Sequence, residues 1–207
     1  MSPERSGFFD LWSRFYDLAP VQAAVYRPVH QTVLRELRDR SSRRLLDVGC
    51  GTGILTARLA DELKAELVAG CDFSFGMLEQ ARHRAPQVAW AQGDALRLPV
   101  RDSAVDAVVS TEAFHWFPDH DAALVEMARV LRPGGQALVA LVNVRRREIS
   151  QLMHGGSQAV GQPAWWPTRT EMRERFARAG FVDVRQRRVL RIAGVVLPTV
   201  VTVGSRP

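Results

Sequence analysis

The sequence has little cysteine and no long apolar run. Its 207 residues include two cysteines, Cys50 and Cys71, too few for a disulfide framework and typical of a reducing compartment. No apolar run reaches the ~18 residues that cross a bilayer. Residues 1–13 also lack the basic-then-apolar order of a signal peptide. We therefore expect a cytoplasmic protein without a membrane span.

Lysine is almost missing as well. Lys64 is the only lysine, and the other 27 of the 28 basic residues are arginines, which give a net charge of +6. These arginines are spread along the chain rather than gathered among aromatic residues, so the charge does not favour a nucleic-acid partner. The chain is 46% apolar and 24% charged, which is typical of a globular protein. Its length predicts one domain.

Apolar runs alternate with helical patterns five times in the first two thirds of the chain. Short continuous apolar strands joined by helices predict a parallel sheet covered on both faces, which is a doubly wound α/β fold. The expected strands span residues 45–48, 67–72, 88–91, 105–110 and 137–142.

The last third of the chain has a different pattern. Thr168–Glu171 is a capping box that opens a helix, and Gly180 ends that helix. Two strand-like stretches follow, 182–192 and 195–203. The short turn expected at residues 193–194 requires them to be antiparallel. The predicted sheet therefore has about seven strands, five parallel and a C-terminal antiparallel pair.

A glycine-rich turn, Gly49-Cys50-Gly51-Thr52-Gly53, follows the first expected strand and precedes a helix. Glycine lets a ligand approach the backbone closely, and ligands of doubly wound sheets bind at the carboxyl ends of the strands. The turn matches neither the dinucleotide fingerprint nor the Walker phosphate loop. A tight turn without a ligand is the alternative interpretation.

Two acidic residues end the neighbouring strands. Asp72 closes the second strand, where an acid can accept hydrogen bonds from both ribose hydroxyls of a nucleoside. Asp94, within Gly93-Asp94-Ala95, closes the third strand, where a carboxylate can accept from an adenine amino group. The alternatives are a surface or helix-capping acid at Asp72, since Ser74 can cap that helix equally well, and a turn aspartate at Asp94.

These motifs occur in the order of a known family. The chain resembles class I S-adenosylmethionine-dependent methyltransferases, particularly the small type 11 group related to ubiquinone and menaquinone biosynthesis. The resemblance rests on residues 45–53, 70–78, 92–96, 114–119, 126–135 and 179–182. It implies a Rossmann-like fold, S-adenosyl-L-methionine as cofactor and S-adenosyl-L-homocysteine as product.

The resemblance also implies roles for individual residues. It places Asp47 and the glycines at the methionine end of the cofactor, Asp72 at the ribose, Phe73 and Met77 beside the adenine, and Tyr16 over the cofactor. Alternatively, the aromatic residues near Tyr16 dock the N-terminal segment on the core. The residues expected to bind the cofactor are Tyr16, Asp47, Gly49, Cys50, Gly51, Thr52, Gly53, Asp72, Phe73, Met77, Gly93, Asp94, Ala95 and Thr111.

His115 follows the fourth strand and is the candidate base that removes a proton from a methyl acceptor. The alternative is a structural histidine held by the backbone or by Asp119. Glu112 is a second candidate, as an acid that binds the acceptor or as a cofactor partner. We expect no metal. His115, Asp119, His120 and Asp121 are close in sequence and could hold a divalent cation. However, the O-methyltransferases that bind a cation at this edge also have an Asp-Asn pair at the end of the fifth strand, where this chain has Val142-Asn143-Val144.

The expected acceptor is a small metabolite. The chain has Ser110-Thr111-Glu112-Ala113 where methyltransferases of exocyclic amines have Asp/Asn-Pro-Pro-Tyr/Phe, and neither cysteine follows a proline as in cytosine C5 enzymes. Trp165 and Trp166 offer a flat apolar surface for an aromatic or apolar acceptor, or they fill a gap beside the helix that begins at Thr168. An RNA methyltransferase and a non-catalytic S-adenosylmethionine-binding protein are the alternative functions.

The expected organisation is one domain, residues 1–207. It consists of an N-terminal helical cap (1–42), a cofactor-binding core (43–142), an irregular loop on the acceptor side (143–167), and a C-terminal helix with the strand pair (168–207). A loop of that length is usually functional or disordered. Because no lid domain is inserted and the cap is short, the acceptor pocket is either open or completed by a second subunit, as in a homodimer.

Overall fold

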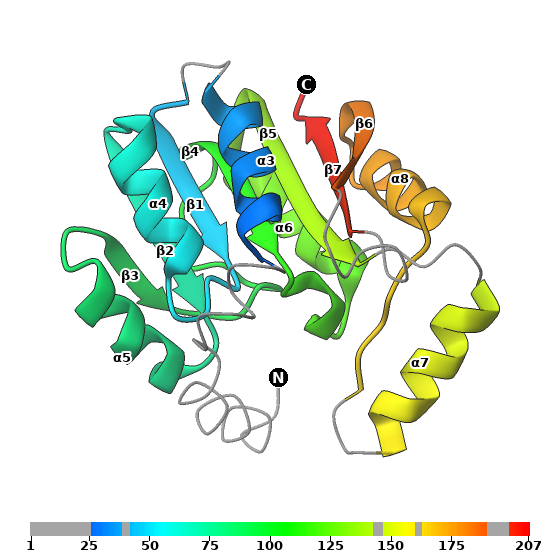
Figure 1. The fold of residues 1–207 in the computed structure, drawn as a ribbon. Helices are drawn as coiled ribbons and strands as arrows, with labels where there is room; N and C mark the ends of the chain where they lie inside the picture. The colour runs from blue at the N-terminus through cyan, green and yellow to red at the C-terminus, as the bar shows by residue number, and fades with distance from the viewer. Residues whose placement is uncertain (1–25, 39–41, 143–146, 160–162, 190–198) are drawn as a thin grey trace.

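The computed structural model describes residues 26–38, 42–142, 147–159, 163–189 and 199–207. These residues form a seven-stranded sheet in the order β3-β2-β1-β4-β5-β7-β6, with helices on both faces (Figure 1). The strands are β1 (Arg44–Val48), β2 (Leu67–Asp72), β3 (Ala89–Gln92), β4 (Val105–Thr111), β5 (Leu131–Val142), β6 (Val182–Val189) and β7 (Thr199–Ser205).

The strand directions confirm the predicted sheet. Strands β1 to β5 pair in parallel, and β7 pairs antiparallel with both β5 and β6. The C-terminal strands are therefore an antiparallel pair in which β7 alone runs against the other strands. The turn predicted at residues 193–194 lies outside the described residues.

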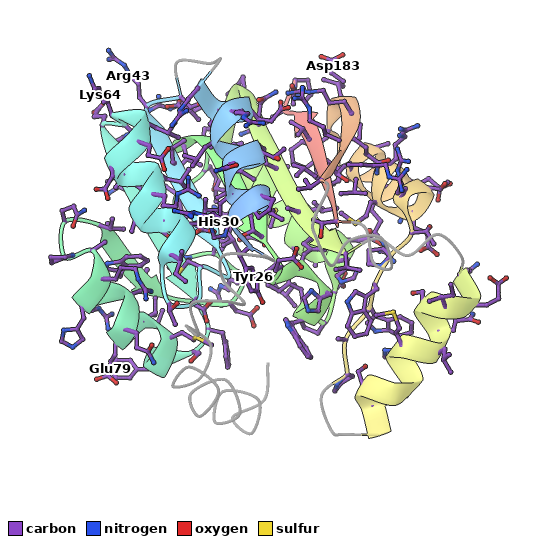
Figure 2. The ribbon with its side chains drawn as sticks, viewed as in Figure 1. Tyr26, His30, Arg43, Lys64, Glu79 and Asp183 are labelled. Carbon is purple, nitrogen blue, oxygen red and sulfur yellow. The ribbon has the colours of Figure 1, made fainter. Side chains whose placement is uncertain are left out.

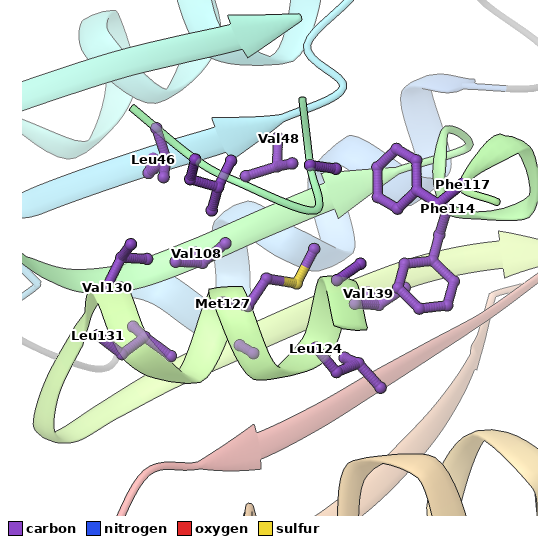
Figure 3. Packing of buried hydrophobic residues seen from close by; sticks show 14 of the residues in the cluster. Leu46, Val48, Val108, Phe114, Phe117, Leu124, Met127, Val130, Leu131 and Val139 are labelled. Atoms are coloured by element: carbon purple, nitrogen blue, oxygen red, sulfur yellow. The ribbon is translucent and has the colours of Figure 1, made fainter. Parts of the chain in front are cut away.

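Side chains alternate between the two faces of the central strands, and each face has its own core. Leu46, Val48 and Val108 pack with α6 and α8 on one face (Figure 3). Leu45 and Val109 pack with α3 and α4 on the other face. Because both faces are buried, the strands need apolar residues at every position, which is why they are continuous apolar runs in the sequence.

Seven helical segments surround the sheet in the described part of the chain. They are α3 (Arg27–Arg38), α4 (Ile54–Leu63), α5 (Phe75–Arg84), the short 3-10 helix η2 (Phe114–Trp116), α6 (His120–Val130), α7 (Arg147–Ala159) and α8 (Arg169–Arg178). No helix among the described residues is long and apolar enough to cross a membrane.

Helix α8 begins and ends as its sequence predicts. The hydroxyl of Thr168 accepts from the Glu171 N–H, and the Glu171 carboxylate accepts from the Thr168 N–H at 2.8 Å, which completes the capping box. At the other end, Gly180 has a φ of +88°. The Phe181 N–H donates to the Phe176 carbonyl and the Gly180 N–H to the Ala177 carbonyl, which is a Schellman cap.

One expectation is corrected. The expected irregular loop over residues 143–167 is wrong for residues 147–159, which form α7. The Gly155-Gly156 pair in this segment is atypical of a helix interior. The glycines 134 and 135 lie in an irregularity of β5, where Gly134 N–H donates to the Arg206 carbonyl.

Candidate functional site

A cavity of about 580 Å³ opens at the carboxyl ends of the parallel strands. This is the edge at which doubly wound sheets bind ligands, and the volume suits a small organic molecule. Five strand ends or the turns after them contribute to the cavity, together with the start of α3 and Trp166. Its lining residues are Tyr26, His30, Val48, Gly49, Cys50, Gly51, Thr52, Ile54, Leu55, Cys71, Asp72, Phe73, Ser74, Met77, Gly93, Asp94, Ala95, Thr111, Glu112, Ala113, His115, Trp116, Phe117, Pro118, Val142 and Trp166.

The three glycines of the turn between β1 and α4 all have positive φ, at +71°, +55° and +77°. A Cβ on Gly49 would lie 2.4 Å from the Ala113 Cβ, and one on Gly53 would lie 2.6 Å from the Trp90 ring. These two glycines therefore permit close packing. A Cβ on Gly51 would meet no atom within 4 Å, and Gly51 lines the cavity. Gly51 is thus the position where the backbone itself is open to a ligand.

Asp72 joins this turn to the end of β2. Its Oδ2 accepts from the Gly51 N–H at 2.8 Å, and its Oδ1 accepts from the Ser74 N–H at 2.9 Å. The capping of α5 is done by Ser74, whose hydroxyl accepts from the Met77 N–H at 3.1 Å. Asp72 therefore lines the cavity and also holds the glycine turn in place.

Asp47 and Gly53 do not line the cavity, and Tyr16 lies outside the described residues. The buried Asp47 side chain accepts a hydrogen bond from the Thr56 hydroxyl at 2.7 Å, behind the turn. Its Oδ1 has no hydrogen-bond partner among the described residues. Burial raises the pKa of Asp47 to about 7. The other predicted cofactor residues all line the cavity.

The end of β3 supplies the far wall. Asp94 Oδ1 accepts from the Leu96 N–H at 3.0 Å, so this carboxylate holds a turn as well as facing the cavity. A Cβ on Gly93 would lie 2.7 Å from Pro99 and 2.9 Å from the Cys71 sulfur, so this glycine allows the chain to pass close to β2. Phe73 and the buried Met77 add apolar surface.

Neither cysteine is activated. Cys50 and Cys71 are buried free thiols, and burial raises the pKa of both, that of Cys71 to about 12. Both thiols therefore stay protonated near neutral pH. Since the thiolate is the nucleophilic form, the two residues fill space at the base of the cavity rather than attack a ligand.

His115 lies in η2, directly after β4. Its ring stacks on Trp166 at 5.4 Å between centroids and 18° between planes, and it also contacts Trp116 at 4.9 Å. Burial and the nearby His120 lower the pKa of His115 to about 3, which keeps the ring neutral. Its buried Nδ1 has no hydrogen-bond partner among the described residues. The expected alternative partner, Asp119, caps α6 instead.

Glu112 is the last strand-end acid of the cavity. Its φ is +55°, unusual for a residue with a side chain. Its N–H donates to the Ala140 carbonyl at 2.8 Å, and its Oε1 accepts from the Thr199 hydroxyl at 3.4 Å. The backbone turn at Glu112 therefore leads the chain from β4 into η2 and so places His115.

Sequence reasoning missed the contribution of α3. Tyr26 and the buried His30 reach the cavity from the start of this helix, with their rings 6.4 Å apart. Figure 2 shows both at the end of α3 away from Arg43 and Lys64, which lie at the opposite edge of the sheet. The only available signal was that residues 29, 33, 34 and 37 share an apolar face, which docks α3 on the sheet.

Helix α7 contacts the segment that contains Trp165 and Trp166. The Ser150 hydroxyl donates to the Trp166 carbonyl at 2.7 Å, and His154 Nδ1 lies 2.8 Å from the Ala164 carbonyl. The Trp165 N–H donates to the His115 carbonyl at 2.8 Å. Trp165 stacks on His154 and is half-exposed, whereas Trp166 faces His115 in the cavity. One tryptophan thus packs against α7, and the other forms a wall of the cavity.

Among the described residues, no group of three histidine, cysteine or acidic side chains is arranged to hold a metal ion. The polar groups of the cavity are instead Asp72, Asp94, Glu112, two histidines and the backbone of the glycine turn. Such groups bind ligands by hydrogen bonds, and the aromatic residues provide flat contact surface.

Comparison with known proteins gives consistent matches. Residues 46–139 match the family described as Methyltransferase domain. The chain is 39% identical over 137 residues to a demethylmenaquinone methyltransferase of Beutenbergia cavernae, covering 65% of this chain and 56% of that protein. It is 36% identical over 143 residues to a malonyl-[acyl-carrier protein] O-methyltransferase of Hahella chejuensis, covering 68% of this chain and 50% of that protein. The chain thus spans about half the length of these curated relatives.

Solved structures share the fold. A Haloferax volcanii methyltransferase, described as putative and solved with the Trm112 methyltransferase activator, has a TM-score of 0.80 at 24% identity, covering 96% of this chain and 97% of that chain. A Haemonchus contortus phosphoethanolamine N-methyltransferase 2 solved with S-adenosyl-L-methionine has a TM-score of 0.73 at 18% identity, covering 86% of this chain and 52% of that one. At these identities the likeness shows the fold.

Proposed function

We propose that the protein is an S-adenosylmethionine-dependent methyltransferase acting on a small molecule, starting from the match of residues 46–139 to the family described as Methyltransferase domain. The single observation that carries the proposal is the open backbone at Gly51 beside Asp72. A nucleoside needs close backbone approach and a carboxylate at the end of the second strand. Both features are present, and they are joined by a hydrogen bond from the Gly51 N–H to the Asp72 carboxylate.

The residues of the cavity fit the cofactor. Asp72 would bind the ribose hydroxyls, Phe73 and Met77 would flank the adenine, and Asp94 with Ala95 would meet its edge. The glycine turn, with Cys50, Thr52 and Thr111, would face the methionine portion. Bound there, S-adenosylmethionine supplies an electrophilic methyl group on a positively charged sulfur that leaves as a neutral thioether.

The aromatic residues beside this region would hold the acceptor. His115, Trp116 and Trp166 present ring faces to the cavity, so they favour an aromatic or apolar acceptor by stacking. Their bulk also excludes water, which matters because the main contribution of the protein to methyl transfer is alignment of the reactants in a dry site.

His115 is proposed as the group that receives the acceptor proton. In a transfer to a hydroxyl, the acceptor oxygen would release its proton to a ring nitrogen of His115 as it takes up the methyl group that the cofactor supplies. The low pKa of this ring makes it a weak base. A weak base is sufficient, because a hydroxyl whose oxygen is gaining a methyl group becomes strongly acidic. The proton would therefore move to His115 late in the reaction. Glu112 is proposed as the acid that orients the acceptor.

Calorimetry with S-adenosyl-L-homocysteine tests the cofactor assignment. We expect the protein to bind this product and Asp72→Ala to weaken binding at least tenfold, since the ribose loses its acceptor. The matched control is Asp61→Ala, an exposed acid of α4 outside the cavity. Undiminished binding by Asp72→Ala would remove the basis of the proposal.

Turnover separates an enzyme from a protein that only binds the cofactor. Transfer of a labelled methyl group is measured over a panel of phenols, quinols and carboxylic acids. We expect His115→Ala to lower kcat at least tenfold and to leave the affinity for S-adenosyl-L-homocysteine within twofold. Cofactor binding without transfer to any acceptor favours a binding protein, and a steep loss of RNA affinity with salt favours an RNA methyltransferase.

A further inference from the structure

A second cavity of about 410 Å³ adjoins the first one. Phe117 and Pro118 line both, so the second cavity begins where the aromatic end of the first one stops. No role has been assigned to it in the proposed reaction. Its lining residues are Phe117, Pro118, Asp119, His120, Arg147, Ser150, Gln151, Trp165, Pro167, Glu171 and Arg175.

Two helices begin at this cavity, and a third contributes its first described residue. His120 is the first residue of α6, Glu171 lies in the first turn of α8, and Arg147 is the first described residue of α7. Figure 1 shows α7 and α8 together at the side of the molecule that carries β6 and β7. The positive ends of helix dipoles favour a negatively charged group, and the guanidinium groups of Arg147 and Arg175 act in the same direction.

The acidic residues of the cavity are already engaged with their own helices. Asp119 Oδ1 accepts from the Asp121 and Ala122 N–H groups at 3.0 Å each. Glu171 Oε2 accepts from the N–H and the hydroxyl of Thr168. Arg147 is held loosely, with its Nε 3.6 Å from Glu171 Oε1 and 76% of its side chain exposed. It can therefore bind another anion without losing a strong pair.

Two buried nitrogen atoms in this wall have no hydrogen-bond partner among the described residues, His120 Nε2 and Arg175 Nε. Arg175 Nε is a donor, and the rest of its guanidinium binds Asp121 at 2.8 Å. The His120 ring bonds to the Phe114 backbone and stacks on the Phe114 ring at 4.5 Å. Burial and Arg175 lower the pKa of His120 to about 4, so Nε2 of the neutral ring is an acceptor.

This pair of atoms indicates what kind of group fits. A buried donor without a partner is costly, and an oxyanion would satisfy Arg175 Nε. A hydroxyl or a water molecule that accompanies the oxyanion would donate to His120 Nε2. An uncharged apolar group would leave both atoms unsatisfied.

We propose that the cavity between the starts of α6 and α8, with Arg147 and Ser150 of α7 in its wall, binds a carboxylate group of the methyl acceptor. This inference rests on the proposed function, because it takes the acceptor to lie at His115 and to extend past Phe117. The acceptor would then be an apolar or aromatic molecule with a carboxylate at the end remote from the methylated atom.

Succinate is the probe, and succinamide is its uncharged counterpart of nearly the same shape. Each is titrated calorimetrically into the full-length protein, with and without saturating S-adenosyl-L-homocysteine. We expect the wild type to bind succinate in the millimolar range and succinamide at least tenfold more weakly. Arg175→Gln and Arg147→Gln should each weaken succinate binding at least fivefold.

Arg178→Gln is the matched control. Arg178 also pairs with Asp121, at 3.3 Å, but it does not line the cavity. Succinate affinity should stay within twofold in this variant. If Arg175→Gln does not fold, the exposed Arg147 carries the test alone.

The outcomes separate the two proposals. Equal binding of succinate and succinamide, no succinate binding by the wild type, or no effect of either arginine substitution overturns the carboxylate subsite. Failure of the wild type to bind S-adenosyl-L-homocysteine overturns the proposed function instead, and the titrations without it still report on the second cavity.

Discussion

Gly51 is the glycine of the turn whose missing side chain leaves open space in the cavity instead of permitting close packing. Its φ of +55° costs an L-residue about 1–2 kcal/mol, but a Cβ there meets no protein atom within 4 Å. We therefore expect Gly51→Ala to fold with a modest loss of stability and to bind S-adenosyl-L-homocysteine at least tenfold more weakly. Calorimetry and urea denaturation measure the two effects.

Gly53→Ala is the contrasting variant in the same turn. Its Cβ would lie 2.6 Å from the Trp90 ring and 2.9 Å from the Ala81 Cβ. Overpacking and positive φ together predict a loss of about 3 kcal/mol in the free energy of unfolding. Equal loss of stability in the two variants would contradict the distinction between an open and a packed glycine.

Helix α3 is joined to β6 by two ion pairs from one buried carboxylate. Glu36 is buried on this helix, and its two carboxylate oxygens bind Arg185 at 2.8 Å and Arg187 at 2.9 Å on β6. The same helix carries His30 to the cavity, and Tyr26, directly before the helix, also lines it. The pair of contacts therefore ties the outer strand to the wall of the candidate site.

Glu36→Gln should lower the free energy of unfolding by about 1–2 kcal/mol. The value is below that for a fully buried ion pair, because the two arginines are partly exposed and can return to water. Glu62→Gln is the control, since its pairs with Arg38 and Arg58 lie at the surface and should contribute under about 0.5 kcal/mol. Urea denaturation of both variants decides whether burial makes the difference.

The central strands β1 and β4 could be predicted from the sequence because each is a short, largely apolar run that is buried on both faces. Strand β2 was expected at its observed bounds, Leu67–Asp72. Helix α7 was missed because its stability comes from contacts such as Ser150 with Trp166, which link residues 16 positions apart. Its two glycines oppose a helix locally. Elements that depend on distant partners leave a weaker local pattern.

The same distinction applies to the candidate site. The glycine turn, Asp72 and Asp94 could be found because each directly follows a strand and parallel strands end at one edge of the sheet. Tyr26 and His30 come from a segment outside that repeat, so only the folded chain brings them to the cavity, whereas Trp166 was already a candidate for the acceptor surface because of its flat apolar ring. Asp47 was expected in the cavity but faces Thr56 behind the turn. Its position in the strand does not indicate which of these two sides its side chain takes.

At the scale of the whole molecule, the buried Asp47 should make stability depend on pH. Its pKa is raised from 3.8 to about 7 in the folded protein, chiefly by burial. Below pH 4 the carboxyl is protonated in both the folded and the unfolded protein, so it carries no charge and its burial does not lower the free energy of unfolding. Between pH 4 and 7 the unfolded chain releases the proton first, so this group lowers the free energy of unfolding as pH rises. Above pH 7 the loss is complete, on the order of 4 kcal/mol.

Asp47→Asn removes this titration and keeps an oxygen that can accept from Thr56. The variant should be more stable than the wild type at pH 7.5, and the advantage should shrink steadily as the pH falls to 4.5, because the wild type regains its proton. Urea denaturation of the two proteins without ligand, at several pH values in this range, measures the difference. A constant difference would mean that Asp47 is ionised throughout, and that a cationic or hydrogen-bonding partner of its Oδ1 outweighs the effect of burial.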